Sequence, residues 1–409
     1  MRILILSQYF WPEEFIINSF ALNLRGQGHT VTVLTGLPNY PNGCFYDGYG
    51  LRGPYRDEYQ GIPICRTPLI SRGNSKGLRL ILNFFSFALS ACLRALFLPR
   101  SYDVILVFEV SPITVGIPAR LLRRLTRAKL YFWVLDLWPD TLSATGVVRS
   151  QKILNGVGKL TSWVYRGCDR ILIASEAFRS SVSQYDAAPE KIFYFPNWAE
   201  HCFRRITLPD ETEEHELMPP GFRIMFAGNV GVSQDFETIL AAAEKTAKID
   251  TSINWVIVGD GRHRSWVEKE IHARSLNNIH LLGRHPKEKM PVFFSLADVM
   301  LVSLKDEPIF RLTVPAKIQA YFACGKPVLS SLNGEGARIV KEAGAGIAVA
   351  AENPEELAEA ACRLAKADPR ELQAMGSRAL EYYEQHFGAD LLIARFEQWM
   401  NADCREGGS

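Results

Sequence analysis

The stretch from Leu312 to Ser331, LTVPAKIQAYFACGKPVLSS, has the pattern of a short helix followed by a buried strand. Pro315 stands where proline is favoured at a helix start, and Gly325 stands where glycine is favoured just past a helix end. Lys317, in the first turn, adds a full positive charge to the partial charge of the helix amino terminus. The stretch therefore predicts a helix–strand unit of an α/β domain with a seat for a phosphate-bearing ligand.

Similar alternation of short apolar runs and helical segments extends along the whole chain. The strands expected in the first half are ILILSQYF, TVTVLTG, ICRTPL, VILVFEV, LYFWVLD, RILIAS and IFYFPN, and those in the second half are RIMFAGN, NWVIVGDG, IHLLG, VMLVSL, PVLSS and GIAVA. Continuous β-branched runs between helices are typical of parallel sheets covered on both faces. We expect an α/β protein with two Rossmann-like, doubly wound domains facing a cleft, and ligands beyond the carboxyl ends of the strands.

The division between the domains is expected at an acidic, proline-bounded segment. At 409 residues the chain exceeds what one hydrophobic core usually serves. The sequence PDETEEHELMPP, residues 209–220, has the composition of a linker. We predict a first domain over 1–203, a linker over 204–221, a second domain over 222–384, and a helix over 385–402 that crosses back to the first domain.

Composition excludes several classes of protein. A net charge of +2 implies no bulk attraction to nucleic acid, so no nucleic-acid partner is expected. The eight cysteines occur singly, without a CxxC pair, which predicts a reduced, cytoplasmic chain without a metal site. The opening MRILILSQYF is expected to be a buried strand and not a signal peptide.

One region departs from this even balance. Residues 66–129 contain eleven basic residues against two acidic ones, a local net charge of +9 that favours an anionic surface. Within the region, Leu78 to Leu98 is almost wholly apolar apart from Arg79, Asn83 and Arg94. Three interpretations remain open for it: a helix of the domain core, a helix in the membrane interface, or a membrane span, against which the interior arginine counts.

Three loops of the second half have features of an anion site. FAGNVGVSQDFETIL is a strand, a glycine turn and a helix, with Gly228 and Gly231 on either side of Asn229. A turn without side chains lets backbone N–H groups approach a diphosphate. VIVGDGRHRSWVEK, which contains Gly259, has the same order. An ordinary tight turn explains each loop alone, whereas three such loops with Lys317 on one sheet favour a binding site.

The first half contributes carboxylates after two of its expected strands. In YFWPEEFIINSFA, helix capping is the simple explanation for Glu13, and Asn18 lies close by. In VLDLWPDTL, Asp140 suits a cap, while Asp136 stands at a strand's carboxyl end, where catalysis is favoured. No GxSxG, HExxH or Walker-type loop occurs in the sequence.

These motifs together resemble the family 4 glycosyltransferases, which have the two-domain GT-B fold. Within the family the chain is similar to L-fucosamine transferases of O-antigen synthesis and to colanic-acid transferases. The segments that carry the resemblance are FWPEE, TGLPNYPNG, LDLWPD, FPNWAE, FAGNVGVSQDFETIL, VGDGRHR and VPAKIQAYFACGKPV.

The resemblance implies a retaining enzyme that uses neither a metal nor a cofactor. It would move a sugar from a UDP-sugar to a saccharide on undecaprenyl diphosphate, in bacterial O-antigen or exopolysaccharide synthesis. The first domain would bind the acceptor and the second the nucleotide-sugar. The implied catalytic residues are Asp136, Lys317 and Glu13, and the implied donor-binding residues are Asn18, Gly228, Asn229, Gly231, Gly259, Arg284, Lys317 and Glu335.

The chain departs from the broad family pattern at several positions. A pair of glutamates, the second of which meets the donor ribose in many members, is replaced by Leu312 and Ala320. Glu335 is our conjecture for that contact. The usual arginine and lysine of the first donor loop are replaced by Asn229 and Gln234, which places more weight on Lys317. Leu135 stands where many relatives have histidine, which suits a 6-deoxy donor such as an N-acetyl-L-fucosamine nucleotide.

The acceptor implies a place in the cell. A lipid-diphosphate acceptor predicts peripheral attachment on the inner face of the bacterial inner membrane, where the basic region and the apolar run would contact anionic lipid. Two other interpretations remain: a UDP-sugar epimerase of the same fold, which needs no acceptor, and a non-catalytic sugar-nucleotide-binding partner in an assembly complex. The linkage and the oligomeric state are not determined by the sequence.

Overall fold

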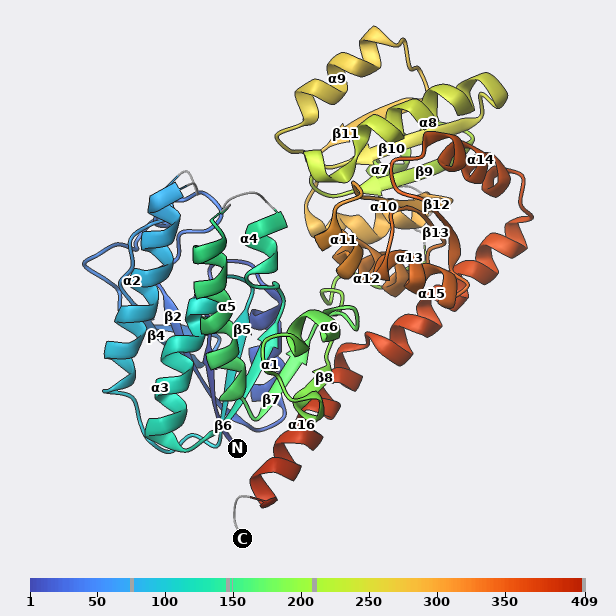
Figure 1. Ribbon diagram of the computed structural model, residues 1–409. Coiled ribbons are helices and arrows are strands. Elements are labelled where there is room, and N and C mark those ends of the chain that lie inside the picture. Colours follow the sequence, from blue (N-terminus) through green and yellow to red (C-terminus); the bar gives the residue numbers. More distant parts are fainter. Residues whose placement is uncertain (74–76, 145–147, 149, 208–211, 407–409) are drawn as a thin grey trace. The chain divides into compact units, whose positions relative to one another are not determined.

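The computed structural model describes residues 1–73, 77–144, 148, 150–207 and 212–406, which form two compact units (Figure 1). The first unit contains Met1–Pro196 together with Leu392–Ser409, and the second contains Asn197–Leu391. Each unit is built on its own sheet, and each sheet is predominantly or wholly parallel. The predicted class, α/β with two Rossmann-like domains, is confirmed.

The sheet of the first unit has the strand order β3-β4-β2-β1-β5-β6-β7-β8. All neighbours are parallel except β3 and β4, which form an antiparallel hairpin at one edge. The strands are β1 (Arg2–Leu6), β2 (Thr30–Gly36), β3 (Arg56–Tyr59), β4 (Ile62–Thr67), β5 (Val104–Glu109), β6 (Lys129–Val134), β7 (Arg170–Ile173) and β8 (Ile192–Tyr194).

Helices cover both faces of the central strands of this sheet, which are mainly apolar. Every residue of β5 is buried, because side chains on both faces of a covered parallel sheet lie under helices. The helices are α1 (Ile16–Gly26), α2 (Gly77–Ala95), α3 (Gly116–Thr126), α4 (Asp140–Ala144), α5 (Gln151–Arg166) and α6 (Phe178–Ser183), with 3-10 turns η1 (Ile113–Val115) and η2 (Pro189–Lys191). Among them, α3 packs against both α2 and α5.

The sheet of the second unit has the order β11-β10-β9-β12-β13-β14 and is parallel throughout. Its strands are β9 (Phe222–Ala227), β10 (Ile253–Val258), β11 (Ile279–Gly283), β12 (Val299–Ser303), β13 (Val328–Ser331) and β14 (Gly346–Val349). Its helices are α7 (Glu213–Glu216), α8 (Phe236–Ile249), α9 (Arg264–Ala273), α10 (Met290–Leu296), α11 (Pro308–Leu312), α12 (Ala316–Ala323), α13 (Glu335–Glu342), α14 (Pro354–Ala365) and α15 (Pro369–His386), with turns η3 (Val232–Gln234) and η4 (Lys287–Lys289).

The described part of the segment predicted as a linker, residues 204–221, belongs to the second unit and contains α7, which packs against α10. Glu214 of α7 is buried and lies 2.9 Å from the Lys289 ammonium. The acidic composition therefore reflects an ion pair with the unit and not a free connection. Residues 208–211 lie outside the described chain.

The last helix, α16 (Ala389–Glu406), belongs to the first unit from Leu392 onward. Its Phe396 ring packs against Phe20 of α1, with ring centroids 5.2 Å apart. Asp403 accepts hydrogen bonds from the Arg170 guanidinium at 2.6 and 2.7 Å and from the Tyr131 hydroxyl at 2.6 Å. A buried ring and a half-buried ion pair thus fix the helix on the first unit.

Candidate functional site

The loops that follow β9 and β10 approach each other closely at the carboxyl edge of the second sheet. Gly259, at the end of β10, has a φ of +148°, and a Cβ there would lie 1.8 Å from the Gly228 carbonyl oxygen. Gly228 itself has a φ of +132°. Only glycine permits this backbone conformation together with this approach. Two of the three glycines predicted for a donor site, Gly228 and Gly259, are therefore required by the local geometry.

Backbone hydrogen bonds connect these loops, which together form the base of a pocket. The Val230 N–H donates to the Asp260 carbonyl at 2.9 Å, and the Gly259 N–H donates to the Gly283 carbonyl at 2.7 Å. A pocket of about 740 Å³ lies over them. Its lining is Gly228, Asn229, Val258, Gly259, Asp260, Gly261, Arg262, Arg284, His285, Lys287 and Met290. The structure thus gathers four of the predicted donor residues, Gly228, Asn229, Gly259 and Arg284.

Lys317 lies beside this pocket. It is in the first turn of α12, which follows Pro315 as the sequence predicts. Its side chain passes so close to Gly228 that a Cβ on that glycine would lie 2.9 Å from the lysine Cε. The ammonium donates to the Gln234 Oε1 at 2.6 Å and lies 4.8 Å from the centroid of the Phe226 ring.

No carboxylate pairs with Lys317 among the described residues. Burial lowers the pKa of its amino group to about 8, so the group is still mainly charged at neutral pH. Its one polar partner, Gln234, is a neutral amide at the position where relatives are expected to have a charged residue. A half-buried cation with no carboxylate partner in the described chain favours the arrival of an anion, because an anion offsets the cost of desolvation.

Gly231 lies just beyond the pocket, where it precedes η3, and its N–H donates to the Asn229 carbonyl. Glu335, the conjectured ribose contact, does not line the pocket. Its buried carboxylate accepts two hydrogen bonds from the Arg338 guanidinium, at 2.8 and 2.9 Å, within α13. The ion pair accounts for Glu335 without a ligand, so the structure gives no support to the conjecture.

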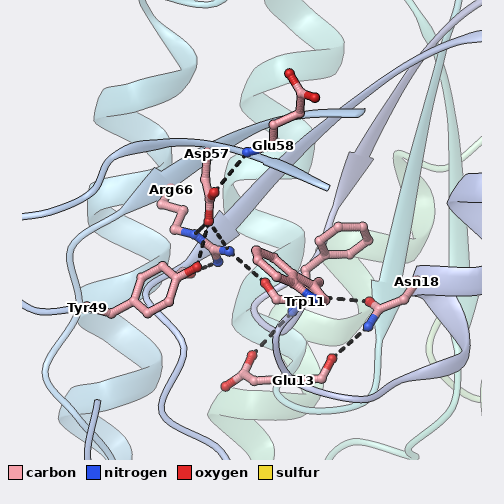
Figure 2. Close-up of polar contacts among 9 residues, drawn as sticks. Trp11, Glu13, Asn18, Tyr49, Asp57, Glu58 and Arg66 are labelled. Carbon is pink, nitrogen blue, oxygen red and sulfur yellow. Dashed lines mark hydrogen bonds and ion pairs between the residues drawn. The ribbon is translucent and has the colours of Figure 1, made fainter. Parts of the chain in front are cut away.

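The Glu13 carboxylate accepts hydrogen bonds from backbone N–H groups of the first unit (Figure 2). Its carboxylate accepts hydrogen bonds from the backbone N–H groups of Asn39 and Tyr40, both at 2.8 Å, and from that of Phe10 at 3.2 Å. Burial raises the pKa of the carboxyl to about 7, although the three N–H donors oppose the shift. Because Glu13 is buried and accepts these three hydrogen bonds, it has a structural role. This role differs from the helix cap that the sequence suggested.

Asn18 supports the same loop. Its Oδ1 accepts from the Trp11 N–H at 3.2 Å, and its Nδ2 donates to the Glu13 carbonyl at 2.7 Å (Figure 2). Arg66 lies on the other side of Trp11, donating to the Trp11 carbonyl at 2.6 Å and pairing with Asp57 at 2.8 Å. The Arg66 side chain is completely buried, so it does not contribute to a basic surface, although the local charge of the sequence includes it.

Asp136 lies two residues beyond β6, at the carboxyl edge of the first sheet. It accepts hydrogen bonds from the Trp138 indole N–H at 3.0 Å and from the Thr141 hydroxyl at 2.5 Å. Burial raises its pKa, and the two donors oppose that shift. Both interactions hold the carboxylate in one position, which is the requirement for a group that acts on a substrate.

Glu109, the last residue of β5, is a neighbouring carboxyl that the sequence analysis did not single out. Neither of its oxygens has a hydrogen-bond partner among the described residues, and it is completely buried. Burial, and then the negative charge of Asp136, raise its pKa well above the usual range. Both effects favour the neutral form of the Glu109 carboxyl, and the backbone N–H groups of Asp136 and Leu135 oppose them. The position of Glu109 at the carboxyl end of an apolar strand was the feature of the sequence that could have identified it as a candidate site residue.

In the described ranges, no three His, Cys, Asp or Glu side chains are grouped to hold a metal ion. The expectation of metal-independent transfer stays a prediction.

Two Rossmann-like α/β units in one chain are the architecture of the GT-B class. Residues 15–198 match the family model described as glycosyl transferase 4-like domain, and residues 221–367 match glycosyl transferases group 1. The matches fall on the first and second units and together span most of the sequence. The two matches support a glycosyltransferase that is similar to family 4 members.

A curated relative agrees with this assignment. The chain is 25% identical, over 337 residues, to the Escherichia coli (strain K12) protein WcaI, which is provisionally named a colanic acid biosynthesis glycosyl transferase. The alignment covers 80% of this chain and 82% of WcaI.

Solved structures share the fold at low sequence identity. Anabaena HepE in complex with UDP is 14% identical with a TM-score of 0.71, covering 98% of this chain and all of HepE. HepE in complex with UDP-glucose is 15% identical with a TM-score of 0.68 at the same coverage. Sucrose-phosphate synthase from Thermosynechococcus elongatus is 16% identical with a TM-score of 0.73, covering 98% of both chains.

Proposed function

We propose that this glycosyltransferase moves a sugar from a UDP-sugar to a saccharide on a lipid diphosphate, in bacterial O-antigen or exopolysaccharide synthesis. The observation that carries the proposal is Lys317, a half-buried cation with no carboxylate partner in the described residues, beside a pocket with a glycine floor. HepE, which has the same fold, holds UDP and UDP-glucose, and the name of WcaI refers to polysaccharide synthesis.

The chemistry asked of the second unit is stabilisation of the leaving diphosphate. In a retaining transfer without a bound metal, negative charge grows on the diphosphate as the bond to the sugar breaks. The Lys317 ammonium is the donor that this unit offers to that charge, and the Gly228 turn, which has no side chain, leaves room for the diphosphate beside it. Such fixed donors act most strongly in a partly dry pocket, where they need no reorganisation.

The donor sugar that we propose is N-acetyl-L-fucosamine or a related 6-deoxy or N-acetylated sugar, as for the L-fucosamine transferase WbuB. Leu135 supports this, because an apolar side chain leaves no polar group unsatisfied against a C6 methyl. The test is turnover of a panel of UDP-sugars by the purified protein. Faster turnover of UDP-N-acetylglucosamine than of any 6-deoxy UDP-sugar would reject the sugar but not the transferase.

We also propose that α2 attaches the enzyme to the inner face of the bacterial inner membrane. It is the one described helix long and apolar enough to cross a membrane, yet one face is packed within the first unit. There, Asn83 accepts a hydrogen bond from the Gln8 side chain at 2.7 Å and donates to the Ile70 carbonyl at 2.6 Å. These contacts favour a helix that lies on the unit over one that leaves it to span a bilayer.

The opposite face of α2 is apolar and exposed. Leu78 is 70% exposed and Leu89 66%, and Phe97 just beyond the helix is 81% exposed. Other exposed apolar side chains on the helix are Ile81, Leu82, Phe85 and Leu93. Burying several such side chains in lipid contributes on the order of 1 kcal/mol each. The exposed arginines Arg79 and Arg100 add about 1 kcal/mol each near an anionic leaflet.

Flotation with liposomes tests the attachment. Phosphatidylglycerol vesicles should retain the wild type at low salt, and Leu89→Ser/Phe97→Ser should reduce that retention at least about tenfold, since two apolar contacts are lost. Ile249→Ser is the matched control, because Ile249 is 62% exposed on the second unit. The proposal fails if the wild type does not float at either low or high salt, or if the double variant floats equally well.

A further inference from the structure

A second basic pocket lies at the amino edge of the second sheet, opposite the strand ends that hold Gly228 and Gly259. Arg223 is the second residue of β9, Asp298 directly precedes β12, and Lys326 lies two residues before β13. All three line a pocket of about 580 Å³. Because every strand of this sheet is parallel, the amino ends of the strands lie on one side of the unit and the carboxyl ends on the other. This pocket, at the amino ends, is therefore distinct from the donor pocket.

The charges around this second pocket are strongly unbalanced. It is lined by Arg204, Arg205, Arg223 and Lys326, with Asp298 as the only acidic side chain in the lining. The Asp298 carboxylate is already engaged by Arg223, whose backbone N–H donates to it at 2.8 Å and whose Nε lies 3.5 Å away. In the described part of the chain, no carboxylate lies within ion-pair distance of the other three cations.

Lys326 resembles Lys317, because burial also lowers the pKa of its amino group and no carboxylate pairs with it in the described residues. Its backbone is fixed, since its N–H donates to the Tyr321 carbonyl at 3.1 Å and it follows Gly325, which has a φ of +64°. Burial lowers the pKa of its amino group to about 8, although the Asp298 charge opposes the shift. The fold thus holds a second lysine in a desolvated position without a paired anion.

The remaining wall is formed by α15 and Arg205. Helix α15 begins at this pocket, and Pro369, Leu372 and Gln373 of its first turns are in the lining. The Asp368 carboxylate caps this helix, accepting from the Arg370 N–H at 2.8 Å, so the preference for an anion comes from the cationic side chains. Arg205 lies close to the Lys326 turn, because a Cβ on Gly325 would be 3.4 Å from the Arg205 Cδ. Arginine side chains can bind two phosphate oxygens at once.

We propose that this pocket is a second anion site, which binds a phosphate-bearing small molecule at the edge of the sheet opposite the donor pocket. The four cationic side chains suit a phosphate or diphosphate group, and the volume suits a small metabolite. The bound group joins Arg204 and Arg205 to the starts of β9 and β13. Binding at this site does not depend on the transfer reaction, so the inference goes beyond the proposed function.

Calorimetric titration of the full-length protein with pyrophosphate tests the site. The wild type should show two saturable sites, of which UDP displaces pyrophosphate from one. Lys326→Met should lose at least about tenfold in affinity at the site that UDP does not occupy, about 1.4 kcal/mol, while Lys326→Arg should retain binding. Lys269→Met, an exposed lysine of α9, is the control for loss of one charge.

The proposal is overturned if the protein has a single pyrophosphate site and UDP blocks it, or if it has two sites and Lys326→Met changes neither. It is also overturned if neither pyrophosphate nor inorganic phosphate binds at Lys326 while flotation with phosphatidylglycerol vesicles depends on this lysine. That last result would show that the pocket binds a lipid headgroup. Failure of the transferase proposal is a separate result, because it would appear as loss of the site that UDP occupies.

Discussion

Replacement of Lys317 by methionine removes the ammonium and keeps an unbranched side chain over Gly228 and Phe226. A unit charge about 4 Å from an opposite charge contributes about 4 kcal/mol at the effective dielectric of a partly exposed site, and screening by water reduces this. We therefore expect kcat/KM to fall by between about tenfold, or 1.4 kcal/mol, and about a thousandfold.

The assay is UDP release with the best donor from the UDP-sugar panel, together with calorimetric binding of UDP. Lys269→Met provides the control for a charge lost elsewhere on the second unit. Thermal unfolding of each variant separates a folding defect from a catalytic one. A folded Lys317→Met enzyme with less than about a twofold change in kcat/KM would refute the role of this lysine, because the predicted minimum is about tenfold.

Three further predictions concern the carboxylates and pH. Glu13→Gln should lower the free energy of unfolding in urea by about 1–3 kcal/mol, because its amide NH₂ cannot accept the hydrogen bonds of the carboxylate; Glu190→Gln, at an exposed glutamate of the first unit, should change stability little. Asp136→Asn should reduce kcat at least about tenfold with a smaller effect on UDP affinity, whereas equal losses would make Asp136 structural. UDP affinity, measured by calorimetry, should fall as pH rises through about 8, because a neutral Lys317 amine no longer pairs with the diphosphate, and should change less in Lys317→Met.

Much of the second unit could be predicted because its signals are local. A proline and a glycine bound α12, so the position of Lys317 in the first helical turn follows from chain geometry. The glycine turns after β9 and β10 are likewise local, and parallel strands bring them to one edge. The sequence could not show that Gln234, 83 residues earlier, is the polar partner of Lys317.

The first unit was harder to predict because its polar residues act over long distances. Arg66 counts as a surface charge in the sequence, yet its pairing with Asp57 across the β3–β4 hairpin buries it. The hairpin itself was missed, since β3 reads RDEY, with no apolar residue except tyrosine. Glu13 has the spacing of a helix cap but bonds to backbone groups of residues 39 and 40, which no local pattern indicates.

The most direct test is mass spectrometry of the purified enzyme incubated with UDP-sugars and lipid-diphosphate-linked saccharides. Transfer predicts an acceptor whose mass rises by one sugar residue, with one UDP released for each product formed. Conversion of the UDP-sugar to an isomer without acceptor would instead indicate an epimerase. UDP binding without any turnover across the donor and acceptor panels would contradict catalysis and favour a non-catalytic binding partner.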